Sequence, residues 1–527
     1  MARVPPLAPA ASAARTLTDA CSVSRRWAQT LSANPLIALG GILVLAAGLR
    51  FSLLGQRSLW SDEMFVVWLV RFKWEAMFST IRTVDFHPPL YYALMKVWVG
   101  LTGVGEAPLR IPSACSSLVS VGLTYALMRK VSSPSISLLS AFAVAVSPFG
   151  IMAGQEARMY PLLGVFVLAS TLALVVSIER GTVFRWGTYV LFAVLMAYTH
   201  YFGFLVLLAH GCWVGGWKRP QLRAWLASIG VTVLSYIPWI PSLWYQVAGS
   251  QGLSAAPASW ASPVDLLGLF AFGGSLFGTA GYFSASSLSL LERLIVILPF
   301  LVILWRGAMS LRSDRSGLAL LALPPVVTIG VAFAFSLAKP VFLPRWFSFL
   351  VPFYAMFLAQ GTFDVAEQVD AQPRQALALF TAALLLYSVP VLDRYYFDPT
   401  ARPFRWRAAA SLVRGLVEPG DFFVYVDTPA EQTFTYYLRE PHPSVTLVPI
   451  GRSLRDPSTI PNLVARYRRV WLIVNGPMSA IMRQRIFASL ASTFRITGHR
   501  NLSGAEVYLF DRQPLPPHEG SKVGSDR

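Results

Sequence analysis

The chain has 527 residues, of which 55% are hydrophobic and 13% are Asp, Glu, Lys or Arg. Soluble globular domains carry roughly 25% charged residues, so this composition excludes an ordinary water-soluble enzyme. The formal charge of +18 does not indicate nucleic-acid binding, because Lys and Arg stand at the ends of apolar blocks and form no Lys-rich tract. We therefore predict an α-helical polytopic membrane protein.

Apolar blocks divide most of the chain into predicted membrane helices. Each block approaches the ~20 residues that a helix needs to cross about 30 Å of hydrocarbon. We expect eleven crossings, at about 35–54, 110–128, 135–153, 157–178, 186–202, 203–217, 224–247, 289–305, 317–338, 343–361 and 376–392. Residues 1–34 are polar and are predicted to be a cytoplasmic N-terminal tail. No clear cleavage site follows the first block, so we expect it to remain as a membrane helix.

One further apolar stretch, Pro88–Leu101, decides the topology of everything after it. If it lies at the outer surface, the downstream clusters of Lys and Arg all fall in cytoplasmic loops, as the positive-inside rule requires. These clusters are Arg129/Lys130, Arg180/Arg185, Lys218/Arg219/Arg223, Arg306/Arg312/Arg315 and Arg374. We therefore expect a transmembrane domain over residues 35–395, with a first outer loop over 55–109, in a bacterial inner membrane.

The C-terminal region, residues 396–512, is charge-rich and is predicted to be a small periplasmic α/β domain. Three short apolar runs predict buried strands at 422–426, 445–448 and 470–474. Helices are expected at 429–439, 460–468 and 477–491. The region contains neither GxGxxG nor GxxxxGK(S/T), so no nucleotide site is predicted. Residues 513–527 are expected to be a disordered tail.

Chemically active residues gather in the outer loops of this topology. The first outer loop reads SLWSDEMF and later DFHPPLYY, which makes candidates of Asp62, Glu63, His87 and Tyr91. Later outer segments add Glu156, Arg158, Tyr160, His200 and Arg345. A carboxylate can act as a general base, and the guanidinium group of arginine can bind phosphate through a fork of donors.

Each candidate also has a structural interpretation. The acidic pair of the first loop could simply be solvated, and the two histidines could be a helix-start residue and a hydrogen-bonded interior side chain. Glu156 and Arg158 could pair with one another across a helix end, and Arg345 could be an interfacial anchor that extends to water. The joint occurrence of carboxylates, histidines and arginines on one membrane face is less expected under these interpretations than any single residue.

Four segments, in this order and spacing, resemble the GT-C superfamily of membrane glycosyltransferases. They are SLWSDEMF, DFHPPLYYALMKVW, APLRIPS and SPFGIMAGQEARMYPLL, within about residues 55–178. The chain is similar to the branch of protein O-mannosyltransferases and aminoarabinose lipid A transferases. Within this branch it most resembles bacterial members related to lipopolysaccharide-core galacturonosyltransferases. Agreement is weaker at THYFG and at PRWFSFLVP.

The resemblance implies a helical membrane core, an active site at the outer face and a polyprenyl-phosphate-linked sugar as donor. It carries the role of catalytic base to Asp62 and matches Glu156 to a second acidic position, which is often Asp in the family. Positive charge for the departing phosphate could come from Arg158 and Arg345. A single displacement at the anomeric carbon would invert its configuration. The acceptor could be a hydroxyl of an envelope lipid, a glycan or a protein.

The sequence contains no clear cofactor motif. His87 and His200 could orient reacting groups or bind a divalent cation, but two histidines so far apart in sequence do not predict a metal site. We therefore predict no particular cofactor, and a divalent cation stays an open alternative.

Two other classes of function stay open. A lipid-linked-sugar flippase or another transporter would favour charged or broken helices near the bilayer midplane, whereas these helix interiors are nearly free of ionisable residues. A non-catalytic envelope-assembly protein could use the C-terminal domain to bind a periplasmic partner. A cytoplasmic nucleotide-sugar enzyme is disfavoured, because the sequence contains no DxD motif.

Overall fold

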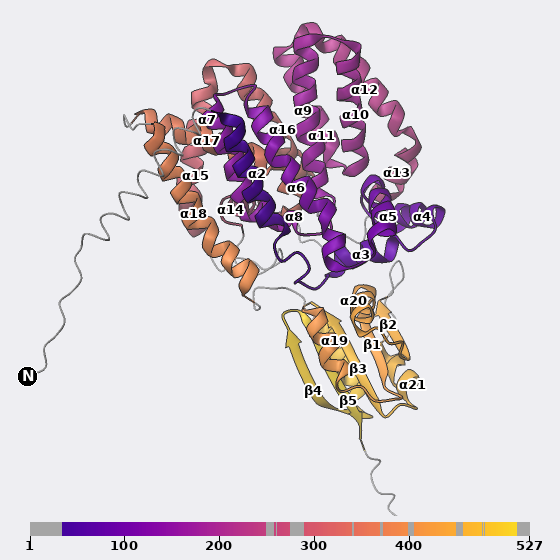
Figure 1. Ribbon diagram of the computed structural model, residues 1–527. Coiled ribbons are helices and arrows are strands. Elements are labelled where there is room, and N and C mark those ends of the chain that lie inside the picture. Colours follow the sequence, from indigo (N-terminus) through magenta and orange to yellow (C-terminus); the bar gives the residue numbers. More distant parts are fainter. Residues whose placement is uncertain are drawn as a thin grey trace, which may run out of the picture. The chain divides into compact units, whose positions relative to one another are not determined.

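Figure 1 shows a computed structural model of the chain. It describes residues 34–248, 258–259, 261–273, 289–339, 342–368, 373–398, 405–448, 457–476, 478 and 480–513. The predicted N-terminal tail up to residue 33 and the predicted C-terminal tail from residue 514 lie outside the described residues. Two compact units make up the chain. The first is Met1–Ser52, Arg110–Pro238 and Gly252–Asp393, and the second is Leu53–Leu109, Trp239–Gln251 and Arg394–Arg527.

The described part of the first unit is built of helices. Its helices, including those that continue into the second unit, are α2 (Pro35–Phe51), α6 (Glu106–Met128), α7 (Pro134–Val146), α8 (Pro148–Gly154), α9 (Tyr160–Arg180), α10 (Val183–Thr199), α11 (Phe202–Trp217), α12 (Leu222–Tyr236), α14 (Ala261–Phe272), α15 (Leu290–Ser310), α16 (Arg315–Ser336), α17 (Val351–Gln368) and α18 (Pro373–Phe397). Short 3-10 segments are η1 (Arg219–Gln221), η2 (Ile237–Trp239), η3 (Leu311–Ser313) and η4 (Pro344–Leu350).

The membrane architecture predicted from the sequence is confirmed. Within the described ranges, seven helices are long and apolar enough to cross a membrane, and the pair α7 and α8, bent by 59°, counts as an eighth. Helices α2, α10 and α11 are apolar but only 16 or 17 residues long. Each of the eleven predicted blocks coincides with one of these helices or helix pairs, while the number of crossings stays a prediction.

The bend between α7 and α8 follows from the local sequence. Ser147 is the N-cap of α8, and its hydroxyl accepts a hydrogen bond from the Gly150 N–H at 3.2 Å. Pro148 occupies the first helical position, where its missing N–H costs least. The same missing N–H prevents α7 from continuing through this point. Two short helices at an angle are the result.

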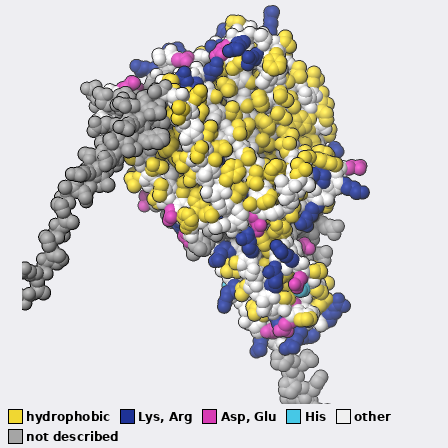
Figure 2. Space-filling view, in the orientation of Figure 1, with side chains coloured by type: hydrophobic (Ala, Val, Ile, Leu, Met, Phe, Trp, Pro, Cys, Tyr) yellow, Lys and Arg dark blue, Asp and Glu magenta, His cyan; other side chains and the backbone are white. Residues whose placement is uncertain are grey.

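Apolar side chains cover the visible side of the helical unit, whereas Lys and Arg gather at one end of it (Figure 2). Leu191, Leu208 and Val231 are each about half exposed on their helices. An exposed apolar surface of this extent is unusual on a soluble protein and is typical of helices that face lipid.

The first outer loop forms three helices of the second unit: α3 (Ser61–Leu69), α4 (Trp74–Val84) and α5 (Leu90–Thr102). With 13 residues, α5 is too short to cross about 30 Å of hydrocarbon. This length supports the prediction that Pro88–Leu101 does not cross. Helix α13 (Ile240–Ala248) packs against α4, and the Gln246 side-chain amide donates to the Ile81 carbonyl at 2.9 Å.

The C-terminal domain contains a five-stranded mixed sheet of order β2-β1-β3-β5-β4. Its strands are β1 (Phe422–Asp427), β2 (Ser444–Val448), β3 (Arg469–Asn475), β4 (Phe494–Leu502) and β5 (Ala505–Arg512). Strand β1 runs parallel to β2 and β3, whereas β5 runs antiparallel to β3 and β4. Its helices are α19 (Trp406–Arg414), α20 (Thr428–Leu438), α21 (Ile460–Val464) and α22 (Ala480–Ala491), with a short η6 (Pro457–Thr459).

Helices cover both faces of this sheet. Alternate side chains of β1 and β3 point to opposite faces, as the two-residue period of a strand requires. On one face Phe423 and Trp471 pack against α19 and α20. On the other face Val424 and Leu472 pack against α21 and α22. The domain therefore has an apolar layer on each side of one sheet.

The three predicted strands match β1, β2 and β3, and the predicted helices match α20, α21 and α22, although α21 ends at Val464 and not at residue 468. Residues 477 and 479 of the third predicted helix lie outside the described residues. Helix α19 and the hairpin of β4 and β5 were not predicted from the sequence. Most side chains of the edge strand β4 are exposed, so this strand lacks the apolar run that identified the others.

Candidate active site

Helix α3 of the second unit begins at the predicted acidic pair. Trp60 is its extended N-cap residue, so Asp62 and Glu63 lie in the first turn, where the helix macrodipole favours negative charge. Glu63 is fully buried, and its Oε2 accepts a hydrogen bond from the Trp60 N–H at 3.4 Å. This contact gives Glu63 a structural role at the helix start. Asp62 is only half-buried, so of the two carboxylates it is the one that a reactant can reach.

A buried Asp–His pair follows in the same loop. His87 Nδ1 lies 3.0 Å from Asp85 Oδ1, and such a carboxylate selects the tautomer and orientation of an imidazole. Tyr91 is buried in the first turn of α5, and its ring meets the Tyr92 ring edge-on at 5.7 Å. The Tyr92 ring lies 6.0 Å from that of Phe65, so aromatic contacts join α5 to α3.

In the first unit, three predicted site residues form one buried cluster. The Arg158 guanidinium carbon lies 5.7 Å from the centroid of the Tyr160 ring, and its Nη2 lies 3.5 Å from the Tyr160 hydroxyl. The Tyr160 ring meets the His200 ring at 6.0 Å. All three side chains are less than a twentieth exposed. A guanidinium group carries a positive charge and a planar fork of donors, so this cluster is a candidate for binding a negative group.

The segment η4, which contains Arg345, reaches the same cluster. The ring of Trp346 lies 5.7 Å from that of His200 and 5.8 Å from that of Phe202. The Phe202 N–H donates to His200 Nδ1 at 3.1 Å, which makes Nδ1 the acceptor nitrogen. Arg345 precedes Trp346 directly and is half-buried. The structure thus places the chain segment of Arg345 beside His200.

The connection between α8 and α9, which contains Glu156, is held from two sides. The Gln155 amide nitrogen lies within 2.9–3.2 Å of three carbonyl oxygens at the end of α2. The Ser113 hydroxyl donates to the Arg158 carbonyl at 3.0 Å, and the Arg158 N–H donates to the Glu156 carbonyl at 2.8 Å. Glu156 itself is half-buried. This segment is a fixed platform for the buried Arg158.

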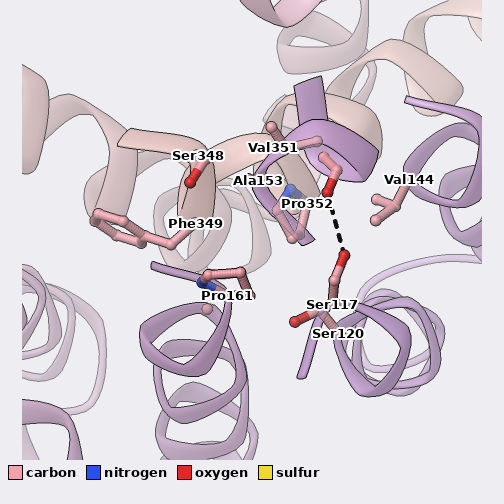
Figure 3. Close-up of a pocket in the computed structure, with 11 residues that line it drawn as sticks. Ser117, Ser120, Val144, Ala153, Pro161, Ser348, Phe349, Val351 and Pro352 are labelled. Atoms are coloured by element: carbon pink, nitrogen blue, oxygen red, sulfur yellow. Dashed lines mark hydrogen bonds between the residues drawn. The ribbon is translucent and has the colours of Figure 1, made fainter. Parts of the chain in front are cut away.

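A small cavity lies between α6, α8, α9 and the start of α17 (Figure 3). Its volume is about 30 Å³, enough for a water molecule and too small for a sugar. It is lined by Ser117, Ser120, Val144, Gly150, Ala153, Pro161, Gly164, Ser348, Phe349, Val351 and Pro352. The Ser117 hydroxyl donates to the Gly150 carbonyl at 3.2 Å across it. The cavity is part of the helix packing and no substrate site.

A larger cavity of about 280 Å³ lies elsewhere in the first unit, among α7, α8, α14, α15, α17 and α18. Aromatic and aliphatic side chains line most of it, including Phe270, Phe300 and Phe380. Its polar groups include the hydroxyls of Tyr354 and Tyr387. A cavity with this lining favours an apolar chain over a sugar.

No metal centre is evident in the described part of the chain, where no three His, Cys, Asp or Glu side chains come close enough to hold an ion. Sequence reasoning did not single out Asp85 or Trp346 as site residues, although each lies within two positions of a predicted one. Their proximity to His87 and Arg345 was the available signal.

Comparisons with known proteins agree with this architecture. Residues 86–245 match the family described as dolichyl-phosphate-mannose-protein mannosyltransferase. No curated protein sequence matches the chain.

Solved structures of similar fold span nearly the whole chain. The apo structure of ArnT from Cupriavidus metallidurans is 14% identical, with a TM-score of 0.57, and the match covers 92% of this chain and 98% of that one. ArnT bound to undecaprenyl phosphate is also 14% identical, with a TM-score of 0.56 and coverage of 90% and 97%. The archaeal oligosaccharyltransferase AglB from Archaeoglobus fulgidus, in complex with an inhibitory peptide and a dolichol-phosphate, is 10% identical, with a TM-score of 0.52 and coverage of 92% and 75%. At these identities the likeness establishes a shared fold.

Proposed function

We propose that the chain is a membrane glycosyltransferase of the GT-C superfamily, similar to ArnT and to the protein mannosyltransferases, and that it transfers a sugar from a polyprenyl-phosphate donor to an acceptor hydroxyl. The observation that carries this proposal is the family match over residues 86–245, because that family is described by a sugar linked to dolichyl phosphate. The acceptor would belong to an envelope lipid, a glycan or a protein.

Two observations support a lipid-linked donor. Structural neighbours of the chain are bound to undecaprenyl phosphate and to a dolichol-phosphate. In addition, the cavity of about 280 Å³ in the first unit is lined mainly by apolar side chains and suits a segment of isoprenoid chain. The sugar that the donor carries follows from neither observation.

The proposed mechanism is a single displacement at the anomeric carbon. The Asp62 carboxylate takes the proton of the acceptor hydroxyl, and the acceptor oxygen forms a bond to the anomeric carbon as the bond to the phosphate oxygen breaks. The electron pair leaves with the polyprenyl phosphate, which is a stable anion and needs no general acid. Arg158 and Arg345 would stabilise the charge that develops on this phosphate. The configuration of the sugar would be inverted.

We also propose an orientation for the chain, with the N-terminus in the cytoplasm and the C-terminal domain in the periplasm. Reporter fusions after Lys130, Lys218 and Arg312 should report the cytoplasm, and fusions after Tyr160 and Arg402 should report the periplasm. A cytoplasmic signal after Tyr160 would remove the outer-face site from the proposal.

The decisive experiment compares Asp62→Asn with Glu63→Gln in purified protein. The assay supplies a panel of polyprenyl-phosphate sugars and an envelope lipid extract, and measures the transferred sugar. Asp62→Asn should lower the rate by about 10²–10⁴, because the amide cannot accept the proton of the acceptor. Glu63→Gln should cost less, because Glu63 is buried against the helix start.

The outcomes separate the claims. Normal transfer by Asp62→Asn, with no transfer by Glu63→Gln or Glu156→Gln, would move the base to another carboxylate and leave the enzyme class intact. No transfer by the wild type from any lipid-linked donor would instead favour a transporter or an envelope-assembly protein. Mass analysis of envelope glycans and lipids from cells with and without the protein would then identify the acceptor.

A further inference from the structure

Residues of the C-terminal domain hold the stretch of chain just before α3, which we call the approach segment (residues 55–59). The Arg407 backbone N–H, in α19, donates to the Ser58 hydroxyl at 3.1 Å. The Arg407 guanidinium reaches the carbonyl oxygens of Gly55 at 3.1 Å and Gln56 at 3.4 Å. One arginine therefore contacts three residues of the approach segment.

A tyrosine of α20 contacts the last residue of the same segment. The Tyr437 hydroxyl accepts a hydrogen bond from the Leu59 N–H at 2.7 Å and donates one to Glu106 Oε1 at 3.1 Å. The same Glu106 oxygen forms a salt bridge with Arg407. Glu106 thus joins the tyrosine and the arginine into one network, although it lies at the start of α6.

The protonation states that this network needs are the ones its surroundings favour. Burial raises the pKa of Tyr437, so its hydroxyl keeps the proton that it donates to Glu106. Burial lowers the pKa of Arg407, but the hydrogen bond and charge of Glu106 raise it by more, so Arg407 stays charged. Each donor therefore faces an acceptor, from the Leu59 N–H through Tyr437 to Glu106 and from Arg407 to Glu106.

The approach segment leads directly into the first turn of α3. Leu59 is fully buried, Trp60 is the N-cap, and Asp62 is the second residue of the helix. Side chains hold the N–H groups of both Leu59 and Trp60, through Tyr437 and Glu63. Because the helix that follows is rigid, the place of Leu59 sets the place of the Asp62 carboxylate.

We propose that Tyr437 and Arg407 are positioning residues for Asp62, so that the C-terminal domain takes part in the transfer by fixing the approach segment. The inference rests on the proposed function, because it takes Asp62 as the base. The hydroxyl of the buried Tyr437 accepts from the N–H of Leu59, which lies two residues before the first residue of α3, so the contact acts on the backbone that leads into this helix.

The test uses the full-length protein and a matched pair of variants. Tyr437→Phe keeps the ring but removes the hydroxyl that holds the Leu59 N–H. Tyr436→Phe is the control, because its hydroxyl donates to the Val104 carbonyl at 2.9 Å, a bond of similar kind away from the approach segment. Arg407→Lys is a second test variant that keeps the charge but cannot reach the same set of carbonyl oxygens.

Two measurements are made on each variant. Hydrogen exchange of peptides over residues 55–62 should become faster in Tyr437→Phe than in Tyr436→Phe, since the Leu59 amide has lost its acceptor. For sugar transfer, kcat should fall by about 10–100-fold in Tyr437→Phe, as a small misplacement of a catalytic group does, with KM for the donor unchanged. Arg407→Lys should show the same split between kcat and KM.

The two measurements distinguish the two claims. Exchange and kcat in Tyr437→Phe equal to those in Tyr436→Phe would overturn the inference, as would a rise in KM alone. If the wild type transfers no sugar while exchange at 55–62 still rises in Tyr437→Phe, the proposed function is wrong. The result that Tyr437 fixes the approach segment is then unaffected. If exchange rises and kcat does not change, Tyr437 does fix the approach segment but does not position the base, and the inference is wrong.

Discussion

A buried arginine at the end of α2 donates hydrogen bonds to backbone carbonyls at the bend between α7 and α8. Its loss should destabilise the first unit. Arg50 is fully buried. Its Nη2 donates to the Val144 carbonyl at 3.0 Å, its Nη1 to the Ala145 carbonyl at 2.9 Å and its Nε to the Ser117 hydroxyl at 2.8 Å. In a regular helix the Val144 carbonyl would bond to the N–H of residue 148, which is a proline and has none.

The change Arg50→Met keeps most of the side-chain length and removes these donors. A buried carbonyl left without a donor costs about 1–3 kcal/mol, so the two carbonyls together predict a loss of about 2–6 kcal/mol. The stability of Arg50→Lys should lie between that of Arg50→Met and that of the wild type, because one ammonium group cannot reach three acceptors at once.

The assay is the fraction of purified protein that stays monodisperse in detergent after heating to a series of temperatures. One kcal/mol shifts the melting temperature by about 2–4 °C in a protein of 150–250 residues, and by less in a longer chain. Arg50→Met should therefore melt several degrees below the wild type. The control is Arg180→Met, which removes an exposed arginine from the end of α9 and should change little. Equal melting of these two variants would refute the role assigned to Arg50.

Three further predictions test other parts of the molecule. Gly361→Ala should abolish the yield of folded protein, measured as the monodisperse fraction, because a Cβ there would lie 1.9 Å from the Ile303 carbonyl oxygen of the neighbouring α15. Burial raises the pKa of Asp427 despite the hydrogen bonds that this carboxylate accepts, so its ionised form destabilises the sheet domain at neutral pH. Asp427→Asn should therefore slow hydrogen exchange in β1 at neutral pH, and the gap should close as the pH falls through the raised pKa and the wild-type carboxyl becomes neutral. Arg345→Lys keeps the charge but loses the planar fork, so donor use should fall with normal yield, and near-wild-type turnover by Arg345→Ala would leave this residue only an anchor.

Much of the fold could be predicted from the sequence because the signals are local. A membrane helix can be recognised from a run of apolar residues whose helical length matches the thickness of the bilayer. All eleven predicted blocks are helical in the structure. Buried strands such as β1 and β3 stand out as short apolar runs for a similar reason. Strand β4 did not stand out, because an exposed edge strand needs no apolar residues and takes its shape from pairing with β5.

The candidate site, like the fold, could be predicted from the sequence only in part. Residue types and order pointed to Asp62, Arg158 and His200, because chemistry restricts which side chains can act as a base or bind a phosphate. The tertiary structure showed that Glu63 is fully buried whereas Asp62 is half-buried, a difference that depends on what packs against the helix.

Only the tertiary structure brings the approach segment and the C-terminal domain together. Leu59 and Tyr437 are 378 residues apart in the chain, and a single hydrogen bond between them leaves no periodic or compositional trace in the sequence. Local patterns determine which segments form membrane helices and buried strands, because the apolar runs that mark these elements involve only residues close together in the chain. Contacts between distant segments depend on the closure of the whole chain, so the network of Glu106, Arg407 and Tyr437 emerges only when the second unit has folded.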